Sequence, residues 1–133
     1  MILAREVVDL RESEDVLKAR QQARALALSV GFGLVDQTKI VTAVSELARN
    51  TVTHGGGGTA TLEVVEYGAH RGLRIVFRDQ GPGIADVEQA LRDGYTTAGG
   101  LGLGLGGSRR LMNDFEISSF PGKGTTVTVV RWK

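Results

Sequence analysis

Apolar residues recur along the chain with two different periods, and each period predicts one type of secondary structure. Between residues 14 and 30 they fall three or four positions apart, which is the spacing of one face of a helix. Residues 37–54 repeat this spacing, and Asp36 is expected to cap the start of that second helix. Shorter helices are expected at residues 85–92 and 108–114. Strands, marked by alternating or β-branched residues, are expected at residues 2–10, 59–67, 73–78, 115–120 and 125–132.

The order of these elements predicts an α+β fold. One strand, two helices and two strands come first, and two short helices and a closing antiparallel strand pair follow. Such an order is typical of a mixed, mostly antiparallel sheet whose helices lie on one face. Because 133 residues suffice for one hydrophobic core, residues 1–133 are expected to form a single domain.

The charge balance and the absence of cysteine limit which partners the chain can be expected to bind and where in the cell it is expected to lie. The 16 basic and 15 acidic side chains leave a formal net charge of +1, which gives no reason to expect nucleic acid or a membrane surface as a partner. The chain has no cysteine, so disulfides and thiolate metal sites are excluded. It also has no apolar run of roughly 20 residues and no basic-then-apolar start. A cytoplasmic location is therefore expected.

Glycine is the one residue type that is clearly in excess. The chain has 19 glycines, about twice the usual share of ~7%. They cluster at residues 55–58, 81–83 and 99–107, between the periodic segments. Clustered glycines indicate loops in which the backbone approaches another group closely.

The first candidate site lies on the second expected helix, where Glu46 and Asn50 share one face. A carboxylate can accept a proton from a hydroxyl group, and an amide oxygen one turn later can bind Mg²⁺. His54 lies a further turn along, within reach of a phosphate. The same spacing also occurs on ordinary solvated helix faces.

A second candidate site, residues 79–84, follows an apolar strand directly. Asp79 at the strand end can accept a hydrogen bond from an exocyclic amino group such as that of adenine. Gly81 and Gly83 would let the backbone lie flat against a planar ring. The alternative interpretation is an ordinary Asp/Gly/Pro turn.

A third candidate site is the glycine-rich segment 99–107 before Ser108. Backbone amides without side chains, followed by a helix N-terminus, can bind phosphate groups. Gly102, Gly104 and Gly107 also match the dinucleotide pattern G-x-G-x-x-G, but no strand precedes them and no Walker A lysine is present. A buried strand with alternating leucines is a further alternative, although glycine at every second position disfavours it.

These features, in this order, resemble the four sequence boxes of the Bergerat ATP-binding fold of histidine kinases. The boxes are Glu-x-x-x-Asn on a helix, Asp-x-Gly-x-Gly after a strand, a glycine-rich lid, and a late Gly-x-Gly-Thr. The resemblance implies that Glu46 is the general base, Asn50 the Mg²⁺ ligand and Asp79 the adenine anchor. The cofactor-binding residues that it implies are Asn50, His54, Asp79, Gly81, Gly83, Ile84, Gly100, Leu101, Gly102, Leu103, Gly104, Leu105, Gly106 and Thr125.

Within this fold the chain is most similar to the anti-sigma-factor kinases, and among them to the RsbT-type switch kinases of bacterial stress signalling. Residues 45–50, 79–84, 93–97 and 110–115 carry this resemblance. It implies a protein serine/threonine kinase that uses ATP and Mg²⁺ and phosphorylates a small STAS-domain antagonist. The kinase then leaves that complex and activates a PP2C-type phosphatase regulator. A monomer or a weak dimer is expected.

Three other functions are compatible with the same motifs. The first is an anti-sigma factor that sequesters a sigma subunit and phosphorylates an anti-anti-sigma factor secondarily. The second is a domain that binds ADP without chemistry, although Glu46 argues against it because nucleotide binding does not require that carboxylate. The third is an ATPase in which Glu46 activates water.

Overall fold

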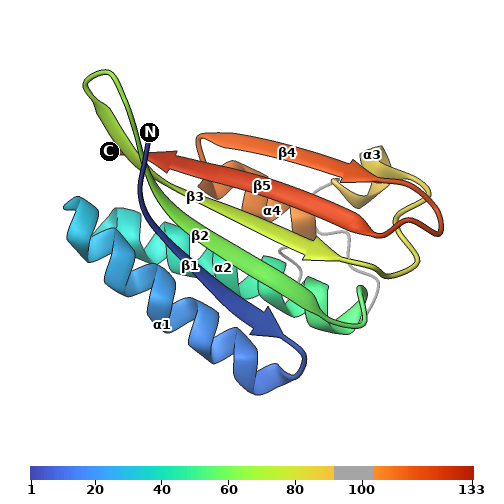
Figure 1. Cartoon of the computed structure of the whole chain (residues 1–133). Coiled ribbons are helices and arrows are strands. Elements are labelled where there is room, and N and C mark those ends of the chain that lie inside the picture. The colour runs from blue at the N-terminus through green and yellow to red at the C-terminus, as the bar shows by residue number, and fades with distance from the viewer. Residues whose placement is uncertain (92–103) are drawn as a thin grey trace.

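A five-stranded antiparallel sheet with the order β1-β2-β3-β5-β4 forms one layer of the molecule. The computed structural model describes residues 1–91 and 104–133. The strands are β1 (Ile2–Leu10), β2 (Gly58–Tyr67), β3 (His70–Asp79), β4 (Asp114–Ser119) and β5 (Thr125–Trp132). The helices are α1 (Ser13–Val30), α2 (Leu34–Thr53), α3 (Val87–Ala90) and α4 (Gly104–Leu111). Helices α1, α2 and α4 lie on one face of the sheet (Figure 1), which confirms the expected α+β architecture.

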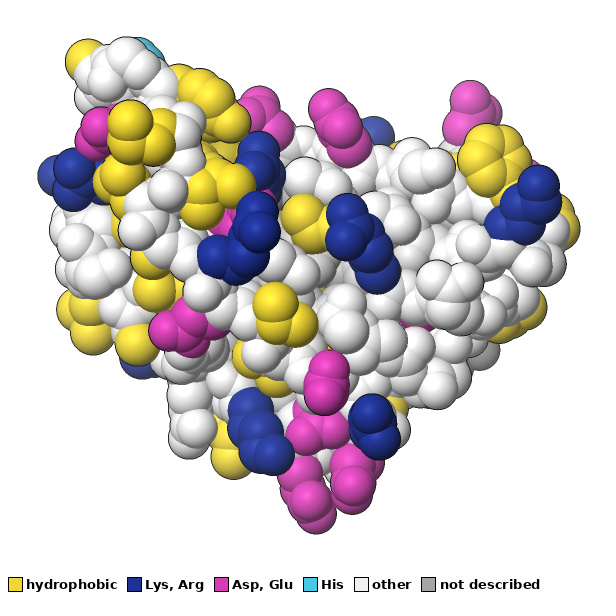
Figure 2. Space-filling view, viewed as in Figure 1, with side chains coloured by type: hydrophobic (Ala, Val, Ile, Leu, Met, Phe, Trp, Pro, Cys, Tyr) yellow, Lys and Arg dark blue, Asp and Glu magenta, His cyan; other side chains and the backbone are white. Residues whose placement is uncertain are grey.

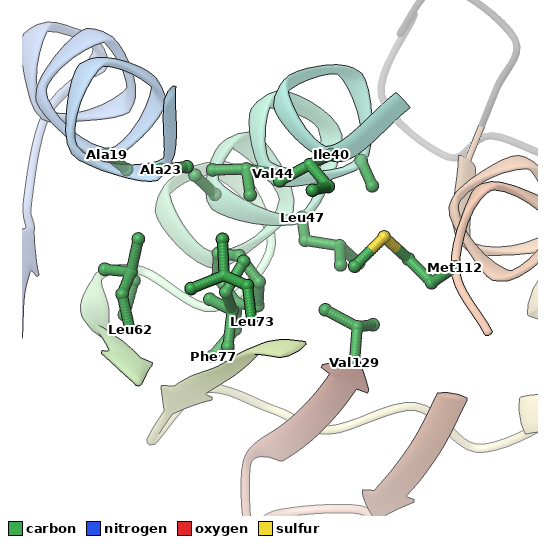
Figure 3. Packing of buried hydrophobic residues seen from close by; sticks show 14 of the residues in the cluster. Ala19, Ala23, Ile40, Val44, Leu47, Leu62, Leu73, Phe77, Met112 and Val129 are labelled. Carbon is green, nitrogen blue, oxygen red and sulfur yellow. The ribbon is translucent and has the colours of Figure 1, made fainter. Parts of the chain in front are cut away.

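The hydrophobic core lies between this helical layer and the sheet. Ala19 and Ala23 of α1 are fully buried, and their small size lets α1 pack closely against α2. Figure 3 shows Leu47 of α2 between this helix pair, the strand residue Val129 and Met112, which follows α4. Most of the residues that the sequence periodicity assigned to the inner faces of the two long helices are buried, but Leu26 of α1 and Val52 of α2 are only partly buried.

The start of α2 differs from the sequence prediction. The helix begins at Leu34 with Gly33 as its cap, so Asp36 lies inside the first turn instead of capping it. The extended backbone of Gly33 places its carbonyl oxygen 2.9 Å from the amide nitrogen of Gln37, which closes the first helical turn early. Asp36 instead accepts a hydrogen bond of 2.8 Å from Nη2 of Arg131, at the positive end of the helix dipole.

Helix α4 also starts earlier than predicted, at Gly104 and not at Ser108. Gly104, Gly106 and Gly107 are buried, and without side chains they let the backbone of α4 lie close to α2. Glycine in a helix costs about 1 kcal/mol relative to alanine, so tertiary packing outweighs the local preference here. The short helix α3 covers Val87–Ala90 within the expected range 85–92, and Asp86 caps it through a hydrogen bond of 3.0 Å from the amide of Gln89.

The face of the sheet opposite the helices carries charged groups of both signs. Figure 2 shows both basic and acidic side chains on the surface in view, with a group of acidic side chains at its lower tip. Among the described residues, no helix combines the length and the apolar character that crossing a bilayer requires.

Glu63 of β2 is a buried carboxylate on this open face. Its side chain accepts hydrogen bonds of 2.8 Å from Nε of Arg5 on β1 and 2.8 Å from Nε of Arg74 on β3. The three residues are register partners across the three strands. Burial raises the pKa of the Glu63 carboxyl, but the hydrogen bonds from both arginines outweigh this effect and hold its pKa below the usual value of 4.5.

We expect this arginine pair to make stability depend on pH in the acid range. Because the pKa of Glu63 is lower in the folded chain than in the unfolded chain, its contribution is full above about pH 4.5 and is lost as pH falls through the folded value. The free energy of unfolding should therefore decrease less between pH 5 and pH 3 in Glu63→Gln than in the parent. Urea denaturation across this range measures it, with Glu116→Gln, an exposed glutamate of β4, as the control. Equal pH slopes for Glu63→Gln and the parent would contradict the prediction.

Candidate functional site

A cavity of about 380 Å³ opens at the end of the sheet where β3 stops and β5 begins. This volume lies within the range of small-molecule sites, which is roughly 300–1,000 Å³. Helix α2, the loop after β3, α3, the start of α4 and the start of β5 all contribute to it. Its described lining residues are Leu47, Asn50, Thr51, His54, Gly55, Phe77, Asp79, Pro82, Gly83, Ile84, Ala85, Asp86, Gln89, Ala90, Gly104, Leu105, Thr125 and Val127.

The sheet register places polar side chains side by side at this end. Asp79 pairs with Thr125, and Thr125 pairs in turn with Ser119 at the end of β4. Residues that are opposite one another on antiparallel strands project to the same face, so these three belong to one row. The row brings together residues that are 46 and 6 positions apart in the sequence.

The Asp79 carboxylate is held in a fixed orientation. Its Oδ1 accepts hydrogen bonds from the backbone amides of Gly81, at 2.9 Å, and Thr125, at 3.2 Å. Within the described part of the chain, no group donates to its second oxygen, Oδ2. A Cβ atom at Gly55 would overlap the Asp79 carboxyl group, so glycine is required there. Asp79 can therefore present one carboxylate oxygen to a hydrogen-bond donor in the cavity.

The loop after Asp79 is bound to the β4–β5 hairpin. The amide of Gly122 donates to the carbonyl oxygen of Pro82 at 2.7 Å, and the amide of Ile84 donates to Oγ of Ser119 at 2.7 Å. Gly83 has a φ of 78°, and a side chain at this position would overlap the carbonyl oxygen of Phe120. These contacts make one wall of the cavity from two segments that are distant in sequence.

Helix α2 contributes another part of the cavity wall, which includes Asn50 and His54. Glu46 lies one turn before Asn50, is only 5% exposed, and is not among the described residues that line the cavity. Its Oε2 accepts a hydrogen bond of 3.0 Å from Nη1 of Arg49, whose side chain is 43% exposed. The ion pair gives the buried Glu46 carboxylate a partner of opposite charge.

The predicted phosphate-binding segment is divided between described and undescribed residues. Gly100, Leu101, Gly102 and Leu103 lie outside the described residues. Gly104 and Leu105 line the cavity as the first residues of α4. Gly106 is buried in the same helix and, like Gly81 in the loop after β3, is not among the lining residues.

Helix α4 is anchored at its other end by Arg131. The guanidinium group donates to the carbonyl oxygen of Leu111 at 3.1 Å and to Asp36 of α2 at 2.8 Å. Because Leu111 is the last residue of α4, this bridge fixes the helix to α2 at the end remote from the cavity. The first turn of α4, which includes Leu105, therefore has a defined position relative to α2.

The donor set fits a nucleotide with its metal better than a metal bound by protein alone. No cluster of three or more His, Cys, Asp or Glu side chains that could hold a metal occurs in residues 1–91 and 104–133. Mg²⁺ is commonly held by one or two protein oxygens together with phosphates and water. Asn50 in the cavity wall can supply one such oxygen, while the open oxygen of Asp79 suits an amino group.

Sequence reasoning missed two residues that shape this site. Ser119 contacts both Ile84 and Thr125, and Gly55 provides the space for Asp79. The pairing of the last two strands could have placed Ser119 opposite Thr125. Nothing in the local sequence relates Gly55 to Asp79, because they meet only when β3 lies beside the end of α2.

Comparison with known proteins places the chain among ATP-dependent enzymes. The profile of a family described as histidine kinase-, DNA gyrase B- and HSP90-like ATPases matches residues 35–133. The chain is 46% identical over 118 residues to the serine/threonine-protein kinase RsbT of Bacillus subtilis, with 89% of both chains covered. It is 30% identical over 129 residues to an anti-sigma F factor of Thermoanaerobacter, which covers 92% of this chain and 89% of that protein.

Solved structures share the fold at lower sequence identity. The RsbU and RsbW domains of a Mycobacterium tuberculosis protein match with a TM-score of 0.68 and 20% identity, over 98% of this chain and 33% of that one. The mycobacterial sensor histidine kinase MprB matches with a TM-score of 0.58 and 19% identity, over 97% of both chains. At this identity the likeness concerns the fold alone.

Proposed function

The chain belongs to the family of histidine kinase-, DNA gyrase B- and HSP90-like ATPases and is a serine/threonine kinase within it, and from this premise we propose how its site works. The cavity binds ATP with Mg²⁺, and the γ-phosphoryl group passes to a Ser or Thr of a STAS-domain antagonist. The observation that carries this proposal is the Asp79 carboxylate, which is fixed by two backbone amides and keeps one oxygen for a ligand.

The adenine end of the site is assigned to the β3–β5 wall. Asp79 Oδ2 accepts a hydrogen bond from the exocyclic amino group, while Thr125 lies beside it in the same row. Apolar neighbours, among them Ile84 and Val127, provide surface for the planar base. The loop containing Gly83 is held in place by the β4–β5 hairpin, so this wall is preorganised before a nucleotide enters.

The phosphate end is assigned to Asn50, His54 and the first turn of α4. Bound ATP supplies the phosphoryl group, and the Mg²⁺ bound with it neutralises phosphate charge. Asn50 offers an amide oxygen for that metal, and His54 lies one turn further along the same wall. The amides at Gly104 and Leu105 add the positive end of a helix dipole at the cavity.

Glu46 is proposed as the general base that accepts the proton of the substrate hydroxyl. It lies one helical turn from Asn50, so a hydroxyl group placed beside the metal ligand also approaches this carboxylate. Arg49 is paired with Glu46 and partly exposed, so its side chain can either move with the Glu46 carboxylate or break the ion pair when the substrate binds. Positioning of the hydroxyl and of the phosphates accounts for most of the rate in phosphoryl transfer, and the base adds to it.

The partner exchange follows from the charge that the reaction creates. Phosphorylation adds a charge of about −1.5 to −2 to the substrate. That charge arises beside the nucleotide phosphates and Glu46, so like charges repel and the phosphorylated antagonist leaves. The released surface then binds a PP2C-type phosphatase regulator, and the two partners exclude each other.

We expect an affinity-tagged chain to retain a STAS-domain protein from native lysate without ATP and to release it, phosphorylated on Ser or Thr, when Mg²⁺ and ATP are added. Mass spectrometry of the retained and released fractions measures this. Glu46→Gln serves as the matched control, because it should retain the same protein and fail to release it on addition of ATP. Recovery of a sigma factor, with no STAS-domain protein and no phosphorylated Ser or Thr, would contradict the proposal.

The 30% identity to an anti-sigma F factor favours a second candidate function. In that case the chain holds a sigma subunit in a stable complex, and its kinase activity acts on an anti-anti-sigma factor. The same experiment separates the two functions, because only the second predicts a sigma subunit in the retained fraction and inhibition of transcription by the purified chain.

A further inference from the structure

The Ser119 hydroxyl makes three hydrogen-bond contacts behind the β3–β5 wall, to which the adenine base is assigned. The amide of Ile84 lies 2.7 Å from its Oγ, the hydroxyl of Thr125 lies 2.7 Å away, and the carbonyl oxygen of Gly124 lies 3.2 Å away. All three partners belong to the wall that holds Asp79. Ser119 therefore occupies the centre of a small network behind the cavity surface.

The chemistry of a hydroxyl group decides the direction of these bonds. A serine hydroxyl has one hydrogen to donate and two lone pairs to accept with. The Ile84 amide can only donate and the Gly124 carbonyl can only accept, so they take one lone pair and the hydrogen of Ser119. Thr125 must then donate its own hydrogen to the remaining lone pair. This is the one assignment that satisfies all three contacts.

The direction of the Thr125 bond fixes the polarity of the cavity surface. With its hydrogen used behind the wall, Thr125 Oγ1 presents only lone pairs to a ligand. Asp79 Oδ2, its neighbour in the same row, is also an acceptor. The base therefore meets an acceptor at each of the two paired residues Asp79 and Thr125, and acceptors suit an amino group or a water that donates. A base with an oxygen at that place sets an acceptor against an acceptor and loses the hydrogen bond that the amino group makes there.

We propose that Ser119 is a specificity-determining residue for the base of the nucleotide, because it fixes the hydroxyl of Thr125 as an acceptor and so disfavours bases that carry an oxygen in place of the adenine amino group. This inference rests on the proposed binding of adenine nucleotides. It goes beyond it in assigning base selection to a residue at the end of β4 that is not among the residues lining the cavity.

The test compares ADP with inosine diphosphate, whose base carries an oxygen where adenine has its amino group. Calorimetry gives the ratio of the two dissociation constants for each variant. In Ser119→Ala the Thr125 hydroxyl is free to turn and donate to that oxygen, so the preference for ADP should fall by about tenfold, which is the effect of one hydrogen bond. Ser119→Thr retains the hydroxyl and should keep the parental ratio. Ser118→Ala is the matched control, because Ser118 is exposed on the opposite face of β4.

A second variant keeps the inference testable if Ser119→Ala does not fold. Thr125→Val removes the hydroxyl itself and should lower the preference by a similar factor, and Ser119→Ala added to it should lower the preference no further. Weaker binding of both nucleotides with an unchanged ratio would overturn the inference, since it would make Ser119 merely structural. A parent that binds ADP and inosine diphosphate equally would also overturn it, while nucleotide binding would stand. A parent that binds neither nucleotide would refute the proposed function itself.

Discussion

Glu46→Gln is expected to bind Mg²⁺ and ATP with the affinity of the parent and to transfer phosphate about 10²–10⁴ times more slowly. The amide has the size of the carboxylate but cannot accept the substrate proton, and loss of a general base typically has an effect of this order. Nucleotide affinity should be retained because Glu46 is not among the described residues that line the cavity. Single-turnover phosphorylation of the substrate protein and calorimetry of ATP binding measure the two quantities separately.

Variants of two neighbouring residues on α2 distinguish loss of the base from loss of the metal ligand or of the ion pair. Asn50→Ala should weaken the dependence on Mg²⁺ as well as the rate, because it removes the proposed metal ligand. Arg49→Gln removes the partner of Glu46 and leaves the carboxylate, so it should reduce the rate much less than Glu46→Gln does. If Glu46→Gln transfers phosphate at the parental rate, Glu46 is not the base.

Asp79→Asn is expected to lose most of the affinity for both ATP and ADP. The two backbone amides on Oδ1 require an acceptor, and the amino group of asparagine then takes the place of the open oxygen. A donor would face the amino group of adenine there, and a polar group left unpaired in this way costs about 1–3 kcal/mol, or roughly a 5- to 150-fold loss of affinity. Calorimetry with ATP, ADP and GTP measures this loss together with the adenine preference of the parent.

Asp86→Asn is the matched control for this variant. Asp86 also lines the cavity, but its carboxylate caps α3, a position that asparagine fills equally well. Its nucleotide affinity should therefore remain close to that of the parent. Equal affinity of Asp79→Asn and the parent for ATP, or equal binding of ATP and GTP by the parent, would contradict the assignment of Asp79 to adenine.

The sequence by itself determined the elements that depend on local periodicity. The inner faces of α1 and α2 follow from apolar spacing, because a helix needs one such face to bury and this requirement is visible in the order of residues. The strands follow from alternation and turn residues in the same way. The order of the motifs also predicted the family, which the profile match confirms.

The ends of the elements, however, were decided by contacts between distant segments. The sequence predicted α4 to begin at Ser108, since glycines locally disfavour a helix, but packing against α2 extends it back to Gly104. Asp36 has the chemistry of a helix cap, yet it lies in the first turn and binds Arg131, which is 95 positions away. The local preferences against these helix boundaries are about 1 kcal/mol per residue, and the contacts with distant segments outweigh them.

The site shows the same division between sequence and tertiary structure. Asp79 and Thr125 were predicted from their motifs, since each stands in a short pattern with recognisable turn residues. Only the pairing of β3, β5 and β4 placed Ser119 beside them and brought the Thr125 amide to the Asp79 carboxylate, and only the approach of Gly55 leaves the space that this carboxylate occupies. Likewise, the spacing of Glu46 and Asn50 predicted a shared helix face, whereas the burial of Glu46 against Arg49 depends on how α2 packs. A sequence specifies which groups are present, but the polarity that a ligand meets depends on hydrogen bonds between strands, which exist only in the folded chain.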